Sequence, residues 1–244
     1  MRYMGSKSRI AEHIVPIIHQ RLDDYGLKKY IEPFVGGANI IDKIQCQERI
    51  GADKQQYLIE IYRNLEKLEE MPEFITREHY SEVRKAYNEN SGAFQDWYIG
   101  MVGFLASYNG RFFDGGYAGL VKTKEDTIRN YYAEAKRNLQ EQIPKLKGIE
   151  WRCGDYREVC EGLEDYVIYC DIPYLGTKQY NASRGFDHEA FWQWAEMMSE
   201  KNVVLVSEST APKHWECIWE QPIKRTINNR NHIDRAERLF EIRE

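Results

Sequence analysis

The spacing of apolar residues changes along this chain from short runs to a helical period and back again. Short apolar runs predict buried strands near residues 29–33, 49–53, 149–152, 166–171 and 202–207. Helical spacing predicts a first helix from Ser6 to Leu22 and another from Asp187 to Lys201. From about Trp215 the chain reads as strand, loop and strand. This pattern is typical of an α/β sheet protein.

A mostly helical block, residues 55–148, interrupts the predicted strands. Apolar spacing there predicts helices around Tyr57–Leu65, Tyr80–Tyr87, Trp97–Leu105 and Glu125–Gln142. Within the block, the segment from Ser107 to Gly119 contains Asn-Gly and Asp-Gly with aromatic residues between them, which predicts a β-hairpin or an irregular ribbon. We therefore expect residues 1–54 and 149–244 to form one domain into which 55–148 is inserted.

A motif of polar and aromatic residues directly follows one predicted strand. Asp171-Ile172-Pro173-Tyr174 comes after the apolar run 166–170, and ligands bind at the carboxyl ends of strands in open α/β sheets. A carboxylate, a turn carbonyl and an aromatic ring suit a flat heterocycle with an exocyclic amine. The two oxygens can each accept one N–H while the ring stacks. An ordinary capped turn is the alternative, since Asp and Pro are common turn formers.

A glycine turn follows another predicted strand. Glu32-Pro33-Phe34-Val35-Gly36-Gly37 leads into a predicted helix from Ile40 to Cys46, and paired glycines allow a ligand to approach the backbone closely. Asp53 ends the next strand about twenty residues on, the spacing that Rossmann-like βαβ units use to bind ribose hydroxyls. The chain lacks GxGxxG, which weakens a dehydrogenase interpretation, and it lacks a complete P-loop, of which Gly5-Ser6-Lys7-Ser8 imitates only the end.

Taken in order, these segments resemble the Dam-like, D12 class of DNA adenine-N6 methyltransferases. The segment from Met1 to Lys7 is similar to the family's amino-terminal motif, Glu32 to Gly37 to its S-adenosylmethionine (SAM) loop, and Asp171 to Tyr174 to its catalytic Asp-Pro-Pro-Tyr motif. Val203 to Glu208 and Glu237 to Phe240 resemble the later strands. The resemblance implies a Rossmann-like sheet with an inserted target-recognition region bearing a β-hairpin. It also implies methyl transfer from SAM to N6 of a flipped adenine in double-stranded DNA.

The resemblance implies roles for single residues as well. Catalysis is expected from Asp171, Ile172, Pro173 and Tyr174. SAM contacts are expected at Tyr3, Met4, Gly5, Lys7, Glu32, Pro33, Phe34, Gly36, Gly37, Asp53, Asp155, Tyr156 and Asp171. Among these, Asp53 is expected at the cofactor ribose and Asp155-Tyr156 beside its adenine. No metal is expected.

The chain departs from the family pattern at two positions. Ala38 stands where the family usually has a further glycine in the glycine loop, and Ile172 stands where it has the first catalytic proline. The family uses the backbone carbonyl at the second position, which isoleucine keeps, while the fixed φ of proline is lost. A branched residue still stiffens the local chain, so we expect retained but slower activity. A DNA-binding relative with weak or lost activity is the alternative, as is a methyltransferase acting on RNA adenine or on a protein amide.

Side chains suited to DNA lie in the segment 107–119 and in two loops. Asn109 can read adenine, Arg111 can read guanine, and aromatic side chains such as Phe112 and Tyr117 can stack or wedge. The alternative is that these aromatics anchor the segment on its own domain. Further DNA contacts are expected from Arg2 beside the amino-terminal motif, from Lys178 and Arg184 after the catalytic motif, and from Lys224, Arg225 and Arg230 before the last strand.

Composition limits this interpretation without changing it. The chain has 244 residues, is 42% hydrophobic and has a formal net charge of −5, so phosphate contacts require locally clustered basic groups. No apolar stretch approaches the length of a membrane span, and no signal segment is evident. The 5 cysteines form no CxxC, which favours reduced thiols over a zinc site. We expect a monomeric, cytoplasmic, bacterial or phage-encoded protein.

Overall fold

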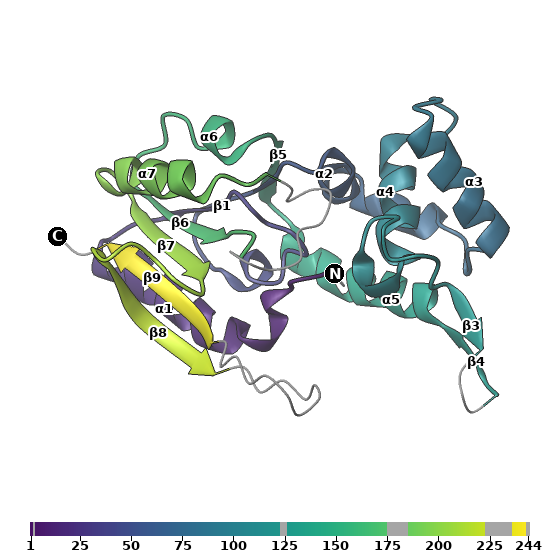
Figure 1. The fold of residues 1–244 in the computed structure, drawn as a ribbon, viewed down its shortest axis with the longest axis horizontal. Helices are drawn as coiled ribbons and strands as arrows, with labels where there is room; N and C mark the ends of the chain where they lie inside the picture. The colour runs from purple at the N-terminus through teal and green to yellow at the C-terminus, as the bar shows by residue number, and fades with distance from the viewer. Residues whose placement is uncertain (2, 123–125, 175–184, 223–235, 243–244) are drawn as a thin grey trace.

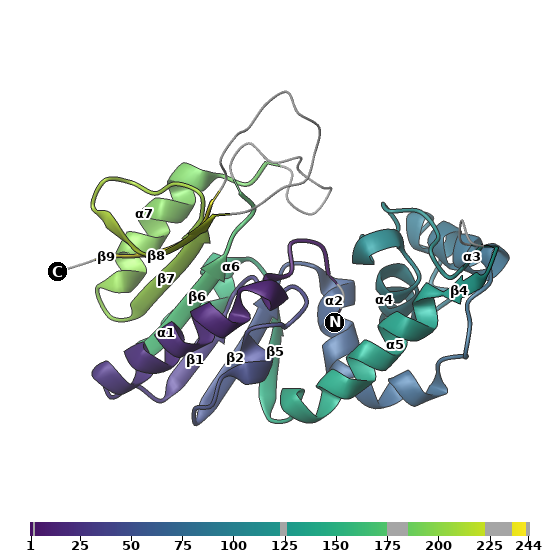
Figure 2. The ribbon, with the colours of Figure 1, turned by 90° about the horizontal axis from the view of Figure 1, so that it is seen from below.

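A computed structural model describes residues 1, 3–122, 126–174, 185–222 and 236–242. Seven of its described strands form one sheet in the order β5-β2-β1-β6-β7-β9-β8, which Figure 2 views from one of its faces. The strands are β1 (Lys29–Glu32), β2 (Glu48–Asp53), β5 (Ile149–Cys153), β6 (Tyr166–Asp171), β7 (Val203–Glu208), β8 (Trp215–Pro222) and β9 (Ala236–Ile242). The first five strands of this order run parallel, while β9 is antiparallel to both β7 and β8.

Helices cover both faces of the sheet. Helix α1 (Ala11–Asp24) covers one face, and α6 (Tyr156–Val159) and α7 (His188–Ser199) cover the other (Figure 1). Side chains of β6 alternate between the two hydrophobic cores, so that Val167 and Tyr169 pack on the α1 side and Ile168 and Cys170 on the α7 side. This alternation is the two-residue period of a strand buried on both faces. The predicted α/β, Rossmann-like sheet is confirmed.

The inserted region lies beside the β5 edge of the sheet (Figures 1 and 2). It contains α2 (Gln56–Arg63), α3 (Arg77–Asn88), α4 (Asp96–Leu105), α5 (Tyr131–Gln142) and the hairpin of β3 (Leu120–Lys122) with β4 (Ile128–Asn130). Its apolar core is continuous with the α1 side of the sheet. Short 3₁₀ turns complete the fold at Lys7–Arg9, Ile41–Lys43, Leu65–Glu70, Tyr108–Gly110 and Ile143–Leu146.

Several predicted boundaries were wrong. The segment Ile40–Cys46 contains only a 3₁₀ turn, and the first α-helix begins at Ala11 because Ser6 instead caps the preceding 3₁₀ turn, accepting a hydrogen bond from the Ser8 amide (3.2 Å). The two-stranded ladder of β3 and β4 follows the segment 107–119, which itself forms the irregular ribbon of the prediction, closed by one antiparallel bridge between Ser107 and Tyr117. Its second strand, β4, takes residues that helical spacing had predicted as helix, and α5 starts after Asn130, whose side chain caps it.

No helix in the described part of the chain is both long and apolar enough to cross a bilayer.

Candidate active site

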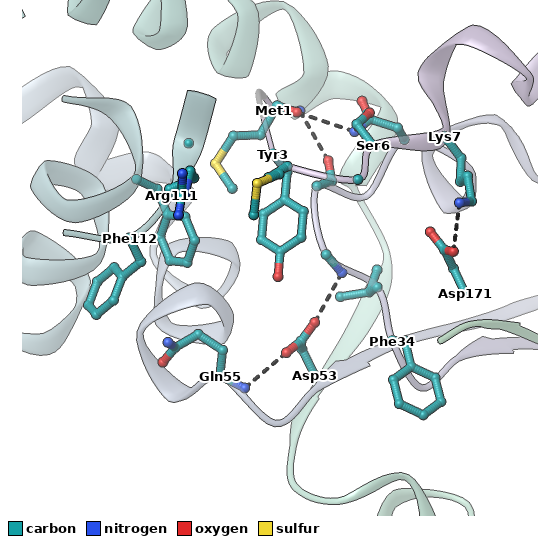
Figure 3. Close-up of a pocket in the computed structure, with 18 of the residues that line it drawn as sticks. Met1, Tyr3, Ser6, Lys7, Phe34, Asp53, Gln55, Arg111, Phe112 and Asp171 are labelled. Carbon is teal, nitrogen blue, oxygen red and sulfur yellow. Dashed lines mark hydrogen bonds and ion pairs between the residues drawn. The ribbon is translucent and has the colours of Figure 1, made fainter. Parts of the chain in front are cut away.

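A cavity of about 2210 Å³ lies between the carboxyl ends of the parallel strands and the inserted region (Figure 3). Glu32, Asp53 and Asp171 end the adjacent strands β1, β2 and β6 and all line it. Parallel strands end at the same edge of a sheet, which brings together acids that are far apart in sequence. The sheet edge supplies one wall of the cavity, and Arg111 and Phe112 lie on the opposite wall (Figure 3).

The catalytic motif predicted from sequence turns into this cavity directly after β6. Asp171, Ile172, Pro173 and Tyr174 all line it. The Ile172 side chain is buried in the core on the α7 side, so the residue that replaces the family's proline is held by packing.

Lys7 lies against this motif (Figure 3), and not against the glycine turn. Its Nζ is 2.9 Å from Oδ1 of Asp171 and donates a hydrogen bond to the Tyr174 hydroxyl at 2.9 Å. Burial raises the pKa of Asp171 to about 6, and the Lys7 ammonium opposes that rise. Burial also disfavours the charged form of Lys7, but the carboxylates of Asp171 and Glu237 outweigh it and raise the pKa of the ammonium. Both groups are therefore charged at neutral pH.

His188 contacts the catalytic turn from the first residue of α7. Its Nε2 lies 2.8 Å from the carbonyl oxygen of Pro173 and 3.7 Å from Oε2 of Glu208, which is buried at the end of β7. Since a carbonyl only accepts, Nε2 carries the proton and donates to Pro173. This bond ties down the turn at the residue after Ile172. This role of His188 could not be predicted from the sequence, because the residue stands only at the start of an amphipathic helix.

The glycine turn is shaped by close contacts. A Cβ added to Gly37 would lie 2.8 Å from Cβ of Tyr3 and 2.9 Å from the Met1 carbonyl oxygen, so no side chain fits there. The Gly36 amide donates to Oδ2 of Asp53 at 3.1 Å, and the Gln55 amide donates to Oδ1 at 2.9 Å. Burial raises the pKa of Asp53, and these amides oppose the rise. Glycine turn and acid thus form one backbone-lined recess.

Aromatic rings form the adjoining wall. The rings of Phe34 and Tyr156 are 5.5 Å apart, and Phe186 packs edge-on against Phe34 at 5.9 Å. Asp155 caps α6, and its hydrogen bonds from Arg157 lower the pKa of its carboxyl. Of the other predicted cofactor residues, the cavity is also lined by Tyr3, Met4, Gly5, Glu32 and Pro33. Glu32 accepts a hydrogen bond from the Tyr30 hydroxyl (2.7 Å), and burial raises its pKa well above the ordinary value.

Side-chain hydrogen bonds link the glycine turn to the inserted region, among them one from the Tyr62 hydroxyl to the Gly36 carbonyl at 2.6 Å. Gln142, the buried last residue of α5, donates through Nε2 to the carbonyl of Ala38 at 2.8 Å and to Oδ2 of Asp42 at 3.0 Å. Gln142 could not be predicted from the sequence, since a glutamine at a helix end carries no distinctive signal.

The segment 107–119 differs from the prediction that its aromatics face DNA. The Phe112 ring packs against the rings of Phe104 (4.9 Å), Tyr87 (5.0 Å) and Tyr57 (5.3 Å), and Phe113 is buried. The Tyr117 hydroxyl donates to the Ile75 carbonyl at 2.6 Å. These rings therefore anchor the segment on its own domain, the alternative weighed above, and we no longer place Phe112 and Tyr117 among the DNA contacts.

Asn109 and Arg111 remain at the cavity. Asn109 has a φ of 55°, a left-handed conformation that asparagine tolerates, and both residues line the cavity wall. Arg111 forms an ion pair with Asp114 at 2.6 Å. Six predicted DNA contacts lie outside the described residues: Arg2, Lys178, Arg184, Lys224, Arg225 and Arg230. Among the described residues, no cluster of three or more His, Cys, Asp or Glu side chains could hold a metal ion.

Similarity to known proteins agrees with this arrangement. Residues 3–209 match the family of D12 class N6 adenine-specific DNA methyltransferases. The chain belongs to this family. It is 26% identical over 198 residues to the type II methyltransferase M.MjaIII of Methanocaldococcus jannaschii, covering 71% of this chain and 68% of that protein. It is 25% identical over 206 residues to the type II methyltransferase M.FokI of Planomicrobium okeanokoites, covering 76% of this chain but only 30% of that longer protein.

Among solved structures, the rRNA methyltransferase AviRa of Streptomyces viridochromogenes is a distant match, with a TM-score of 0.44 and 12% identity over 98% of this chain and 86% of that chain. The predicted membership of the D12 class is confirmed by the family match. This enzyme is accordingly a DNA methyltransferase specific for adenine N6, and its family uses SAM as the methyl donor.

Proposed function

We propose that this D12-class enzyme flips an adenine out of a specific double-stranded DNA sequence and methylates its N6 amine at the Asp171–Tyr174 turn. The observation that carries the proposal is the position of this turn. It lines the same cavity as the glycine turn and Asp53, so an amine acceptor and a nucleoside-binding recess face one space. We assign residues 1–54 and 149–244 to catalysis and residues 55–148 to target recognition.

The residues of the recess fit the cofactor. Gly36 and Gly37 bring the turn into the cavity lining, the Asp53 carboxylate can accept from ribose hydroxyls, and the Phe34 and Tyr156 rings offer apolar surface to an adenine. SAM held in this recess would supply an electrophilic methyl group with sulfur as the leaving group, and the proton that N6 loses on methylation would pass to solvent. The recess residues bind and orient, and none of them has to transfer a proton.

The catalytic turn acts on the amine. The lone pair of an aromatic amine is delocalised into the ring, which makes N6 a weak nucleophile. Asp171 and the Ile172 carbonyl can each accept one N–H, which favours a tetrahedral nitrogen with its lone pair directed away from the ring. The Asp171 carboxylate also stabilises the positive charge that develops on N6. The Tyr174 ring holds the base by stacking, and His188 holds the turn through the Pro173 carbonyl.

The inserted region faces the DNA in this proposal. Asn109 and Arg111 offer groups that can read base edges. The β3–β4 hairpin presents exposed apolar side chains, Leu120 at 39% and Ile128 at 75% exposure, together with the basic Lys122 and Arg129. Apolar side chains on a projecting hairpin suit insertion beside a flipped base, and basic ones suit phosphates. Which base sequence is recognised depends on contacts with DNA.

The decisive test is transfer of a tritium-labelled methyl group from SAM to DNA, RNA and protein offered separately. We expect label in adenine N6 of duplex DNA, and long-read sequencing of DNA from cells expressing the chain should then reveal one methylated motif. Label in RNA or protein alone would refute the proposed substrate. Asp171→Ala serves as the inactive control, and calorimetric binding of SAM to that variant shows whether its recess is intact.

A further inference from the structure

Lys7 and Glu237, from opposite ends of the chain, meet Asp171 and Tyr174 of the catalytic turn. Lys7 Nζ is 2.9 Å from Asp171 Oδ1, 2.9 Å from the Tyr174 hydroxyl and 3.3 Å from Oε2 of Glu237 on β9. The Tyr174 hydroxyl also donates to Oε2 of Glu237. The Lys7 ammonium therefore touches both side chains assigned to the flipped base, and Glu237 touches two members of the same group.

Burial makes this arrangement costly unless the charges stay paired. Lys7 is only 9% exposed, and its two carboxylate neighbours are 22% and 19% exposed. An ammonium removed from water to this extent is tolerated because it is paired on two sides. Such a lysine has little freedom to move, so its contacts fix the position of the groups that it holds.

The two carboxylate oxygens of Asp171 have different surroundings. Oδ1 faces Lys7, whereas Oδ2 makes no hydrogen bond to any residue in the described part of the chain. A carboxylate can accept bonds on both oxygens. The arrangement thus leaves one oxygen for the amine of a base while the other is held in place.

We propose that Lys7 and Glu237 are positioning residues for methyl transfer: Lys7 orients Asp171 and Tyr174 toward the base, and Glu237 holds Lys7 between them. The inference rests on the proposed function of this cavity. It assigns Lys7 to the base side, whereas the resemblance placed it at the methionine part of SAM. Glu237 lies beyond residues 3–209, the range that matches the family.

The charges around Asp171 predict opposite effects for the two residues. Three carboxylates surround Asp171: Glu237 on β9, Glu208 on β7 and Glu32 on β1. Its other titratable neighbours are Tyr3, Tyr169, Tyr174 and the imidazole of His188. Lys7 lowers the pKa of Asp171, and Glu237 raises it. Removing the ammonium should therefore raise that pKa, while removing the Glu237 charge should lower it.

The experiment compares wild type with Lys7→Met and Glu237→Gln. Asp171 must be ionised to accept from the amine, so the acid limb of kcat/KM for DNA should follow its pKa. We expect this limb to move to higher pH in Lys7→Met and to lower pH in Glu237→Gln, each by about one unit. In both variants kcat should fall roughly tenfold or more, because small displacements of reacting groups are expensive. The affinity for SAM, measured by calorimetry, should stay the same.

An exposed ion pair provides the matched control. Lys201 and Glu164 are 63% and 56% exposed and paired with each other, so Lys201→Met and Glu164→Gln make the same charge changes away from the cavity. We expect wild-type pH profiles from both. The inference would be overturned if the acid limb of the pH profile moved equally in the cavity and surface variants. It would also be overturned if this limb did not move in the cavity variants. Loss of SAM binding in Lys7→Met, with an unmoved limb, would return Lys7 to the cofactor.

A direct titration separates this inference from the proposed function. Carbon NMR of labelled aspartate carboxyls can follow Asp171, assigned by its absence in Asp171→Asn, in a protein with or without activity on DNA. Opposite pKa movements in Lys7→Met and Glu237→Gln support the charge arrangement even if DNA is not the substrate. If DNA is methylated but the Asp171 titration is the same in all three proteins, the proposed function stands and the positioning roles fall. Glu237→Gln is close to isosteric, so the test survives if Lys7→Met fails to fold.

Discussion

The end of β6 and the segment 107–119 both attracted functional predictions, yet the fold treats their side chains oppositely. At the end of β6, charged and polar side chains are drawn inward and face a cavity. In the segment 107–119, the rings of Phe112 and Phe113 pack into an aromatic cluster with the neighbouring helices, although both residues also border the cavity. A strand fixes where its last residue points, whereas an irregular segment is positioned by whichever side chains bury most apolar surface.

The largest effect is expected in the aromatic segment. Phe113 is 4% exposed and packs against Phe112, Tyr80 and Tyr87. Phe113→Ala should lower the free energy of unfolding by about 3–5 kcal/mol, since it leaves a large cavity in a packed cluster. Chemical denaturation followed by circular dichroism measures this. Tyr108→Ala, at an exposed ring of the same segment, is the control, and equal stability of the two variants would contradict the anchoring role.

At the end of β6, substitution of Asp171 should leave the fold intact and strongly reduce the rate of methyl transfer. Asp171→Ala deletes an acceptor for the amine, which should lower kcat by roughly 10²–10³-fold, or about 2.7–4 kcal/mol. Asp171→Asn should lose less activity, because its amide oxygen still accepts. Single-turnover methylation at saturating SAM and DNA is the measurement. A wild-type rate in Asp171→Ala would make Asp171 an ordinary turn residue.

Two substitutions at Tyr174 separate the contribution of its ring from that of its hydroxyl. Tyr174→Ala should reduce kcat/KM for DNA by about 1–3 kcal/mol through loss of stacking on the base. Tyr174→Phe keeps the ring and loses the contacts of the hydroxyl, among them those to Lys7 and Glu237, so its loss should be smaller, about 0.5–1.5 kcal/mol. Steady-state kinetics with varied DNA distinguishes them. Equal losses in the two variants would mean that only the hydroxyl matters.

Arg111 is the position at which the two regions could converge. If it reads a base, Arg111→Ala should cost about 1–3 kcal/mol at one base position and relax the methylated motif without weakening SAM binding. Asp114→Asn is the matched variant, because it breaks the ion pair with Arg111 but keeps the guanidinium. Methylome sequencing of cells expressing each variant measures the motif. An unchanged motif and rate in Arg111→Ala would confine Arg111 to holding its own segment.

Much of the sheet and the acids at its edge could be predicted from sequence. Asp171, Asp53 and Glu32 each end an apolar run, and parallel strands bring such ends together whatever the intervening chain does. The 3₁₀ turn at Ile41–Lys43 was harder to predict, because a helical period over so few residues does not distinguish a 3₁₀ turn from an α-helix.

The supporting residues could not be found in this way. Lys7 was singled out but placed at the cofactor, since a sequence motif does not show which neighbour a long side chain reaches. His188 and Gln142 reach the site from helix ends, and their partners are backbone carbonyls. A carbonyl is present at every residue and leaves no trace in the sequence. Phe112 and Tyr117 were expected at the DNA because an aromatic side chain serves burial and stacking equally well until its neighbours are known.

The bond from Gln142 to the glycine turn limits how recognition regions could be exchanged among enzymes of this kind. Gln142 closes the inserted region, yet its amide satisfies the carbonyl of Ala38 and the carboxylate of Asp42 in the other part of the protein. A chimera with a foreign insertion in place of residues 55–148 would leave that buried carbonyl without its donor, a loss of about 1–3 kcal/mol. Grafts that keep the last turn of α5 should therefore be the ones that retain a folded glycine turn.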